Sequence, residues 1–189
     1  LEAKFNYYLG FACVNLDDYK RAVKAFKGGL AVVYENPELG SSMAEQLAMS
    51  YREMGEFEKS YDAFEKSLAF VEDVYVMNNY AYFLATDLVD IQRALELSSM
   101  ANEAQPDEPN FLDTQALILY LLNRSEEALV LIQKAQEILG PDYADAVFLE
   151  REGDILWELG EYESAKAKWN AAVEAGGGKK RLNEKLAQT

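Results

Sequence analysis

One pattern recurs five times along the chain: a small residue near the start of a predicted helix, usually followed four positions later by a large apolar residue. The small residues stand at positions 22, 60, 94, 128 and 165, so successive copies lie 38, 34, 34 and 37 residues apart. A second small residue stands twelve or thirteen positions before each of them (Gly10, Ala48, Ala81, Ala116, Gly153). Small side chains let two antiparallel helices approach closely, and the large residues fill the space beside them. The spacing therefore predicts five helical hairpins in a repeat array.

We expect one array over residues 1–189, with hairpins at about 3–36, 41–73, 74–108, 109–141 and 146–177. The longer intervals are assigned to turn-rich connections at residues 35–40 and 140–142, and Gly55 and Gly160 are expected to form turns inside hairpins. Residues 178–189 place Leu182 and Leu186 on one helical face, which predicts a C-terminal capping helix. Because the chain opens at Leu1 and its first helix begins almost at once, we expect a fragment of a longer chain.

The pattern resembles the tetratricopeptide repeat family, whose period is about 34 residues. The resemblance covers about Leu1 to Gly177. The third to fifth copies are more similar still to the C-terminal part of long bacterial proteins of this family, through the motifs at 78–82 (NNYAY), 111–114 (FLDT) and 150–157 (EREGDILW). The family resemblance implies an all-α, right-handed α-α superhelix that binds other proteins and has no catalytic activity.

Composition excludes several classes of site. The chain has no histidine and one cysteine, which disfavours metal sites, histidine-based catalysis and internal disulfides. The formal net charge of −15 would repel nucleic acid phosphates and anionic lipid headgroups. No run reaches the roughly 20 apolar residues of a membrane helix. We therefore expect no cofactor, no metal, no nucleic acid partner and no membrane insertion.

The family resemblance also implies where a partner binds. Positions 2, 5, 9, 12 and 13 of each repeat's first helix line the concave face in the family. Aromatic rings and carboxylates recur at these positions, and rings of this kind are favoured as interface anchors. The candidate peptide-binding groove consists of Tyr7, Phe11, Glu45, Met49, Arg52, Tyr75, Asn78, Tyr82, Asp113, Leu117, Tyr120, Glu150, Asp154 and Trp157.

A groove of rings and carboxylates suits a protein or peptide segment with apolar and basic side chains. The family's chaperone-binding members hold a C-terminal carboxylate with Lys, Arg and Asn. Here Asn15 and Asn78 match, but we find no set of basic groove residues, so that mode is disfavoured. Each ring has packing between repeats as its alternative, and each carboxylate a solvated face. Trp157 is the ring for which a structural role is least expected, and Asp113 has the start of its helix as an alternative partner.

Two classes of function follow. The first is a non-catalytic scaffold that binds a protein segment in the concave groove. The second is a structural or self-assembly module acting through repeat edges or the convex face, and the weakly basic ends of an acidic body favour head-to-tail self-association. A third, remote reading is an accessory domain of an enzyme encoded upstream of Leu1. The bacterial resemblance favours the periplasm or cell envelope, with the cytoplasm left open.

Overall fold

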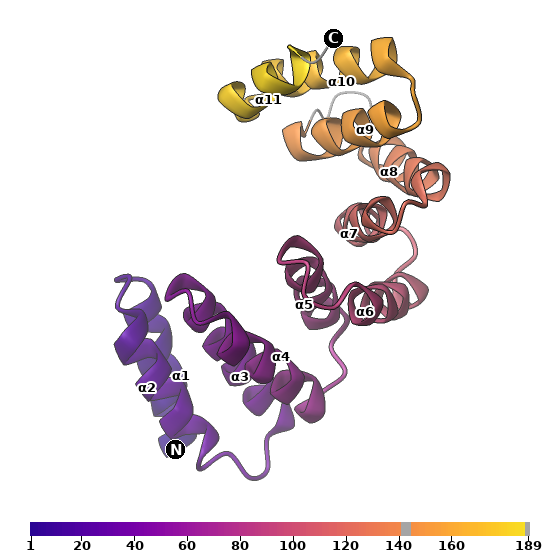
Figure 1. The fold of residues 1–189 in the computed structure, drawn as a ribbon. Helices are drawn as coiled ribbons and strands as arrows, with labels where there is room; N and C mark the ends of the chain where they lie inside the picture. Colours follow the sequence, from indigo (N-terminus) through magenta and orange to yellow (C-terminus); the bar gives the residue numbers. More distant parts are fainter. Residues whose placement is uncertain (141–144, 188–189) are drawn as a thin grey trace. The chain divides into compact units, whose positions relative to one another are not determined.

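A computed structural model describes residues 1–140 and 145–187 of the chain (Figure 1). These residues hold eleven helices and no strand, which confirms the predicted all-α class. The first ten helices follow one another as five helix–turn–helix pairs, and a short helix ends the chain. The helices are α1 (Glu2–Val14), α2 (Tyr19–Leu30), α3 (Pro37–Glu53), α4 (Phe57–Phe70), α5 (Val74–Thr86), α6 (Ile91–Ala104), α7 (Pro109–Leu121), α8 (Ser125–Leu139), α9 (Ala146–Glu158), α10 (Tyr162–Glu174) and α11 (Lys179–Leu186).

The turn inside each pair has the same backbone conformation. One residue takes a positive φ of 55–81°, and the amide of the next residue donates to the carbonyl five positions earlier at 2.9–3.1 Å. This is the Schellman arrangement that ends many helices. The left-handed residues are Asp17, Gly55, Leu88, Asn123 and Gly160. The turns predicted at Gly55 and Gly160 are therefore confirmed, and three further turns use residues with side chains.

The small residues of the repeat lie where paired helices cross. Those at the start of α2, α4, α6, α8 and α10 are fully buried. A Cβ added to Gly10 would lie 2.3 Å from the Phe26 ring, and one added to Gly153 would lie 2.4 Å from the Trp169 ring. The predicted close approach of paired helices is therefore confirmed at these two crossings.

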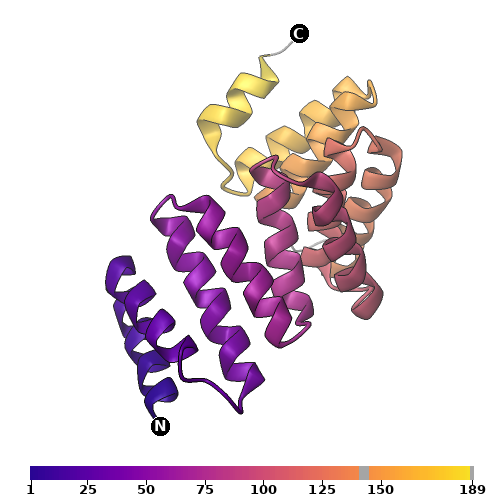
Figure 2. The same cartoon turned by 60° about the horizontal axis from the view of Figure 1, so that its bottom comes forward.

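The chain divides into two compact units, Leu1–Tyr80 and Ala81–Thr189. In the first unit, α1 to α4 lie side by side (Figure 2). A buried hydrogen bond joins the Ser41 and Ser67 hydroxyls at 2.9 Å. The connection expected at 35–40 is shorter than predicted, because Pro37 starts α3 and the Asn36 side chain accepts a hydrogen bond from the Leu39 amide. Asparagine is a favoured N-cap, and proline suits the first helical position.

The second unit has two apolar clusters. The first joins α7, α8 and α9 through side chains that include Leu119, Ile132 and Ile155. The second consists of Trp169, Ala172 and Leu182, with Leu186 packed against it. The predicted C-terminal helix is thus confirmed as α11, which covers the end of the last hairpin. The connection predicted at 140–142 includes Pro141 and Asp142, which lie outside the described residues.

None of the helices described is long and apolar enough to cross a membrane.

Candidate functional site

The candidate residues of α1 lie in a run of aromatic contacts. The ring centroids of Tyr7 and Phe11 are 4.9 Å apart, edge to face. Phe11 also contacts the buried Phe26 of α2, with centroids 6.2 Å apart. Such pairs stabilise helix packing. Phe11 therefore contributes to the α1–α2 hairpin, whatever else it contacts.

The candidates of α3 have neighbours in their own unit. The Asn79 amide donates to the Glu45 carboxylate at 3.3 Å. Burial raises the pKa of Glu45, and this outweighs the lowering by the Asn79 hydrogen bond, while the charge of Asp73 raises the pKa further. The Arg52 guanidinium lies 5.1 Å from the centroid of the Phe57 ring, within cation–π range. Met49 is half-buried.

Two candidates in the first half of α5 differ in exposure. Tyr75 is exposed, whereas Asn78 is buried. The Asn78 side-chain oxygen has no hydrogen-bond partner among the residues described. Tyr75 is thus the more accessible of the two.

The second unit brings four candidates together around one pocket of about 330 Å³. Its walls come from the last turns of α5, from α7, from α9 and from α11. We call it the α9 pocket, and it is lined by Tyr82, Thr86, Leu117, Val147, Glu150, Arg151, Asp154, Arg181 and Lys185. Tyr82, Leu117, Glu150 and Asp154 were expected in the groove, and the other five lining residues were not.

The carboxylates in and beside the α9 pocket are paired with basic residues. Glu150 accepts hydrogen bonds from Arg181 at 2.5 Å and from Lys185 at 2.8 Å. Asp154 accepts from Lys185 at 2.6 Å and from the Trp169 indole N–H at 2.9 Å. The expectation of a groove without a set of basic residues is therefore wrong for this pocket, since α11 brings two cations to α9.

Asp113 of α7 is buried and ion-paired. The Arg151 Nε donates to its Oδ1 at 2.8 Å, and the two side chains are 14% and 10% exposed. The pair joins the first helices of two successive hairpins. Asp113 thus has a partner beyond the start of its own helix, and Arg151 reaches the α9 pocket from that pair.

Comparison with known proteins supports the repeat. Residues 42–70, which lie in α3 and α4, match the family model described as tetratricopeptide repeat. A search of curated proteins gave no match. A solved fragment of MamA from Desulfovibrio magneticus RS-1 (41 to the end) superposes with a TM-score of 0.77 at 14% identity, covering 93% of this chain and 95% of the solved one. The chain has the tetratricopeptide repeat fold.

Two other solved structures agree. The solved chain of Pseudomonas aeruginosa PilF gives a TM-score of 0.76 at 16% identity, over 96% of this chain and 79% of that one. A tetratricopeptide repeat protein from Parabacteroides merdae ATCC 43184 gives 0.82 at 16% identity, over 98% of this chain and 71% of that one. At these identities the likeness concerns the fold, and all three proteins are bacterial.

Two aromatic candidates of the second unit pack against the apolar clusters. Tyr120 is half-buried against the α7–α9 cluster, and burial raises the pKa of its hydroxyl, with further raising by the charges of Asp154 and Glu158. The Trp157 ring lies between Tyr162 and Trp169, with centroids 4.6 and 5.2 Å away. Trp157 therefore has a packing role, contrary to the expectation that it would be the least structural ring.

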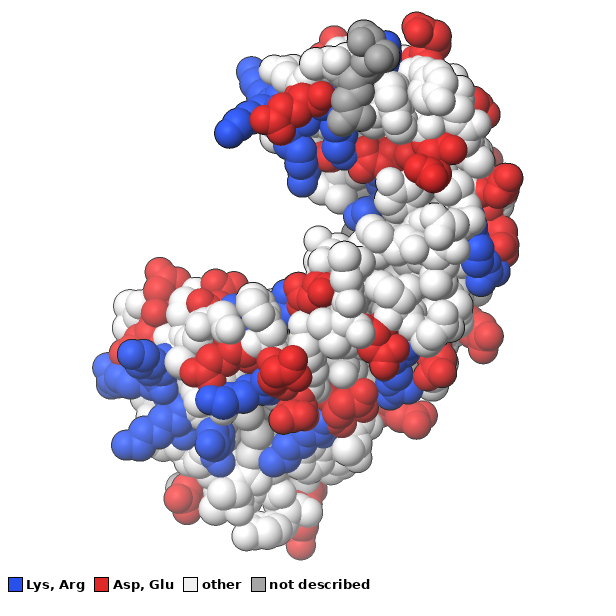
Figure 3. Space-filling view, in the orientation of Figure 1, with Lys and Arg blue, Asp and Glu red and all other residues white. Residues whose placement is uncertain are grey.

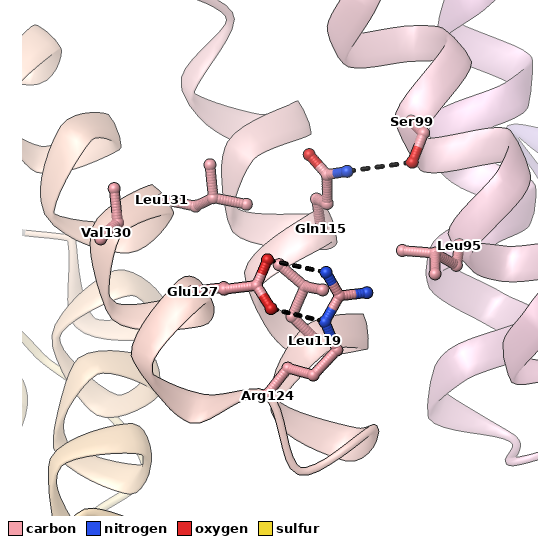
Figure 4. A pocket seen from close by; sticks show the side chains of 8 residues that line it. All are labelled: Leu95, Ser99, Gln115, Leu119, Arg124, Glu127, Val130 and Leu131. Carbon is pink, nitrogen blue, oxygen red and sulfur yellow. Dashed lines mark hydrogen bonds and ion pairs between the residues drawn. The ribbon is translucent and has the colours of Figure 1, made fainter.

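A second pocket of about 410 Å³ lies between α6, α7 and α8 (Figure 4). It is lined mainly by leucine and polar side chains, and the Gln115 amide donates to the Ser99 hydroxyl at 3.1 Å across it. Arg124 and Glu127 form a two-bond ion pair at 2.7 Å at its edge. No predicted groove residue lines this pocket.

In the described parts of the chain, no group of three or more His, Cys, Asp or Glu side chains is placed to hold a metal ion.

Proposed function

We propose that this chain is a non-catalytic interaction scaffold that binds a segment of another protein in the α9 pocket. The observation that carries the proposal is the origin of the pocket walls, since α5, α7 and α9 are the first helices of three successive hairpins. In the family, these helices carry the binding face. The likeness to MamA and PilF supports a scaffold of the same fold and leaves the partner open.

The side chains of the α9 pocket suit a peptide. Tyr82 and Val147 are 38% and 54% exposed, so they offer apolar contact area at the rim. Glu150, Asp154 and the basic residues beside them offer hydrogen-bond donors and acceptors next to that apolar area. Ligand sites typically combine apolar walls with a few convergent polar groups.

The test is a selection of displayed random peptides against the full chain, followed by affinity measurements on variants. We expect Tyr82→Ala combined with Val147→Ala to weaken the selected peptides at least tenfold, because exposed apolar anchors carry much of the binding energy. Tyr34→Ala is the matched control, since Tyr34 is an exposed tyrosine of the first unit. An equal loss of peptide affinity in the double variant and in the control, or no loss of affinity in the double variant, would contradict the proposal.

A separate observation favours self-association as a second candidate. The first helix exposes Phe5 and Tyr8, together with Leu1 and Leu9, on the first unit. Contiguous exposed apolar side chains often mark an interface. If this face joins two copies, sedimentation velocity will show a dimer that Phe5→Glu with Tyr8→Glu converts to a monomer. A wild-type chain that stays monomeric up to millimolar concentration would eliminate this candidate.

A further inference from the structure

The C-terminal helix presents the kind of segment that the groove was expected to bind. Arg181 and Lys185 lie one helical turn apart, and Leu182 and Leu186 lie one turn apart beside them. We propose that α11, which forms one wall of the α9 pocket, stands on α9 in the place of an external segment, and that this external partner is an amphipathic helix with the same pattern of paired basic and paired leucine-like residues, which displaces α11. This inference rests on the proposed function and specifies its partner and its regulation.

The polar contacts of α11 are made to α9 residues that line the α9 pocket. Arg181 and Lys185 both donate to Glu150, and Lys185 also donates to Asp154. Glu150 is buried, at 7% exposed, and α11 supplies both of its basic partners. Figure 3 shows the basic side chains gathered at α11 beside acidic ones of the same unit. α11 therefore acts as a ligand whose positive charges match α9.

The apolar contacts of α11 are few and local. Leu182 is fully buried with Trp169, and Leu186 packs against the same cluster as Leu149 and Trp157. The Lys185 ammonium also lies 5.8 Å from the centroid of a Trp169 ring. One buried leucine and one partly buried leucine thus hold the helix beside the ion pairs.

Several features make α11 easy to release. It is eight residues long, and isolated helices shorter than about 12–15 residues are marginal in water. Gly178 precedes it, and no side-chain cap is found at its start among the residues described. Gly176, at a φ of 91°, stands in the link to α10. Local opening of such an end segment requires much less free energy than unfolding of the hairpins.

Release has a specific electrostatic consequence. When α11 leaves, Glu150 and Asp154 lose the cations that pair with them, and of the contacts described above only the Trp169 indole N–H stays on Asp154. Arg151 does not replace them, because it is held by Asp113. A segment that displaces α11 must therefore return positive charge to α9 and apolar side chains to the Trp169 cluster. An acidic or purely apolar segment does not meet both requirements.

The test uses the full chain and a synthetic peptide with the sequence of residues 177–189 as the probe. We expect Arg181→Glu combined with Lys185→Glu to release the tail. The labelled peptide should then bind this variant at least tenfold more tightly than it binds the wild-type chain, and the affinity should fall as salt rises. Both tryptophans of the chain, Trp157 and Trp169, belong to or contact this cluster, so their fluorescence reports tail release and peptide binding directly.

Two further measurements, one on a variant of the chain and one on a variant of the peptide, test whether the peptide binds at Glu150 and Asp154. Glu150→Gln with Asp154→Asn, added to the released variant, should weaken the peptide at least tenfold, because the amides cannot pair with its cations. A peptide with both basic positions changed to glutamate should not bind. If the double charge reversal does not fold, as judged by circular dichroism, Lys185→Gln alone serves as the milder release and should still increase peptide affinity.

Each other outcome overturns the inference. Equal affinity for wild-type and released chains would mean that the tail does not occupy the site, and absent binding to both would mean that the site does not accept such a helix. A wild-type dimer that the charge reversal converts to a monomer would place the tail in a second copy. Selected peptides that need Tyr82 and Val147 yet bind both chains equally would leave the proposed function standing without this regulation.

Discussion

At the residue scale, the repeat turns show how strongly tertiary structure overrides local preference. All five turns need one left-handed residue, and two use glycine, whose missing Cβ removes the steric penalty. Asp17 and Asn123 belong to the residue types that tolerate this conformation. Leu88 does not, yet it has a φ of 55° and is 67% exposed. The backbone at Leu88 is therefore strained, and the side chain buries little apolar surface to offset that strain.

This contrast predicts that Leu88→Gly stabilises the protein. Relief of left-handed strain is worth about 1–2 kcal/mol, and the added freedom of glycine in the unfolded chain removes about 0.4–1 kcal/mol of that gain. We expect a net increase of roughly 0.5–1 kcal/mol in the free energy of unfolding, measured with urea. Gly160→Ala, in the corresponding turn of the fifth hairpin, should lower it by a similar amount. A loss of stability in Leu88→Gly would show that the exposed side chain contributes more packing than its accessibility indicates.

Glu45 gives a prediction about pH. Because burial raises its pKa in the folded chain, ionising it is less favourable there than in the unfolded chain. Its contribution to stability is therefore largest at low pH and is lost as the pH rises from the ordinary glutamate value through the raised one. Glu45→Gln should stabilise the chain near pH 7 and have little effect below about pH 4.

Thermal unfolding over this pH range provides the measurement, and exposed Glu35→Gln is the control. If Glu45→Gln is destabilising at neutral pH, then the Asn79 hydrogen bond outweighs burial, and the pKa of Glu45 is not raised in the folded chain.

At the element scale, helix pairing depends on the small residue at each crossing. The α9–α10 crossing offers a sharp test, because a Cβ on Gly153 would meet both the Trp169 indole and the Ala165 carbonyl oxygen. Gly153→Ala should destabilise the chain by about 1–3 kcal/mol, as overpacking does in other cores. Trp169→Leu in the same background should recover part of this loss. Gly178→Ala is the control, since a Cβ there would meet no atom within 4 Å; an equal effect of both alanines would refute the crossing argument.

The elements could be predicted from sequence because their signals are local. Small residues at helix crossings and glycines in turns recur at a nearly fixed spacing, so the helix pairs follow from periodicity. The start of α3 was missed although Asn36 and Pro37 are standard signals for a helix start. The left-handed turn residue Leu88 could not be predicted, because nothing about a leucine indicates a left-handed conformation.

The contacts of the candidate site are harder to predict from sequence, because they join different elements. Tyr82, Leu117, Glu150 and Asp154, which were expected in a groove from their repeat positions, all line the α9 pocket. The ion pairs that α11 and Arg151 make were not predicted, since a sequence does not say which carboxylate a distant cation reaches. The packing of Trp157 depends on Tyr162 and Trp169 of the neighbouring helix, which a single-helix pattern cannot indicate.

At the scale of the whole molecule, the division into two units agrees with the physics of repeat arrays. Stability in such arrays is roughly a sum of terms within each repeat and between nearest neighbours. Damage to one hairpin is therefore expected to remain local. The chain offers a convenient way to observe this, because both of its tryptophans lie in α9 and α10 of the second unit, whereas every helix contributes to circular dichroism.

Phe26→Ala should uncouple the two signals. Phe26 is fully buried in the first unit, and removal of such a side chain typically costs about 3–5 kcal/mol. We expect a circular dichroism transition at lower denaturant for α1 and its neighbours, while the tryptophan fluorescence midpoint stays at the wild-type value. Ile132→Ala, in the second unit, should instead shift the tryptophan transition. If Phe26→Ala shifts both signals by the same amount, the chain unfolds as one cooperative body, and the interfaces between neighbouring hairpins must then be strong relative to the stability of each hairpin alone.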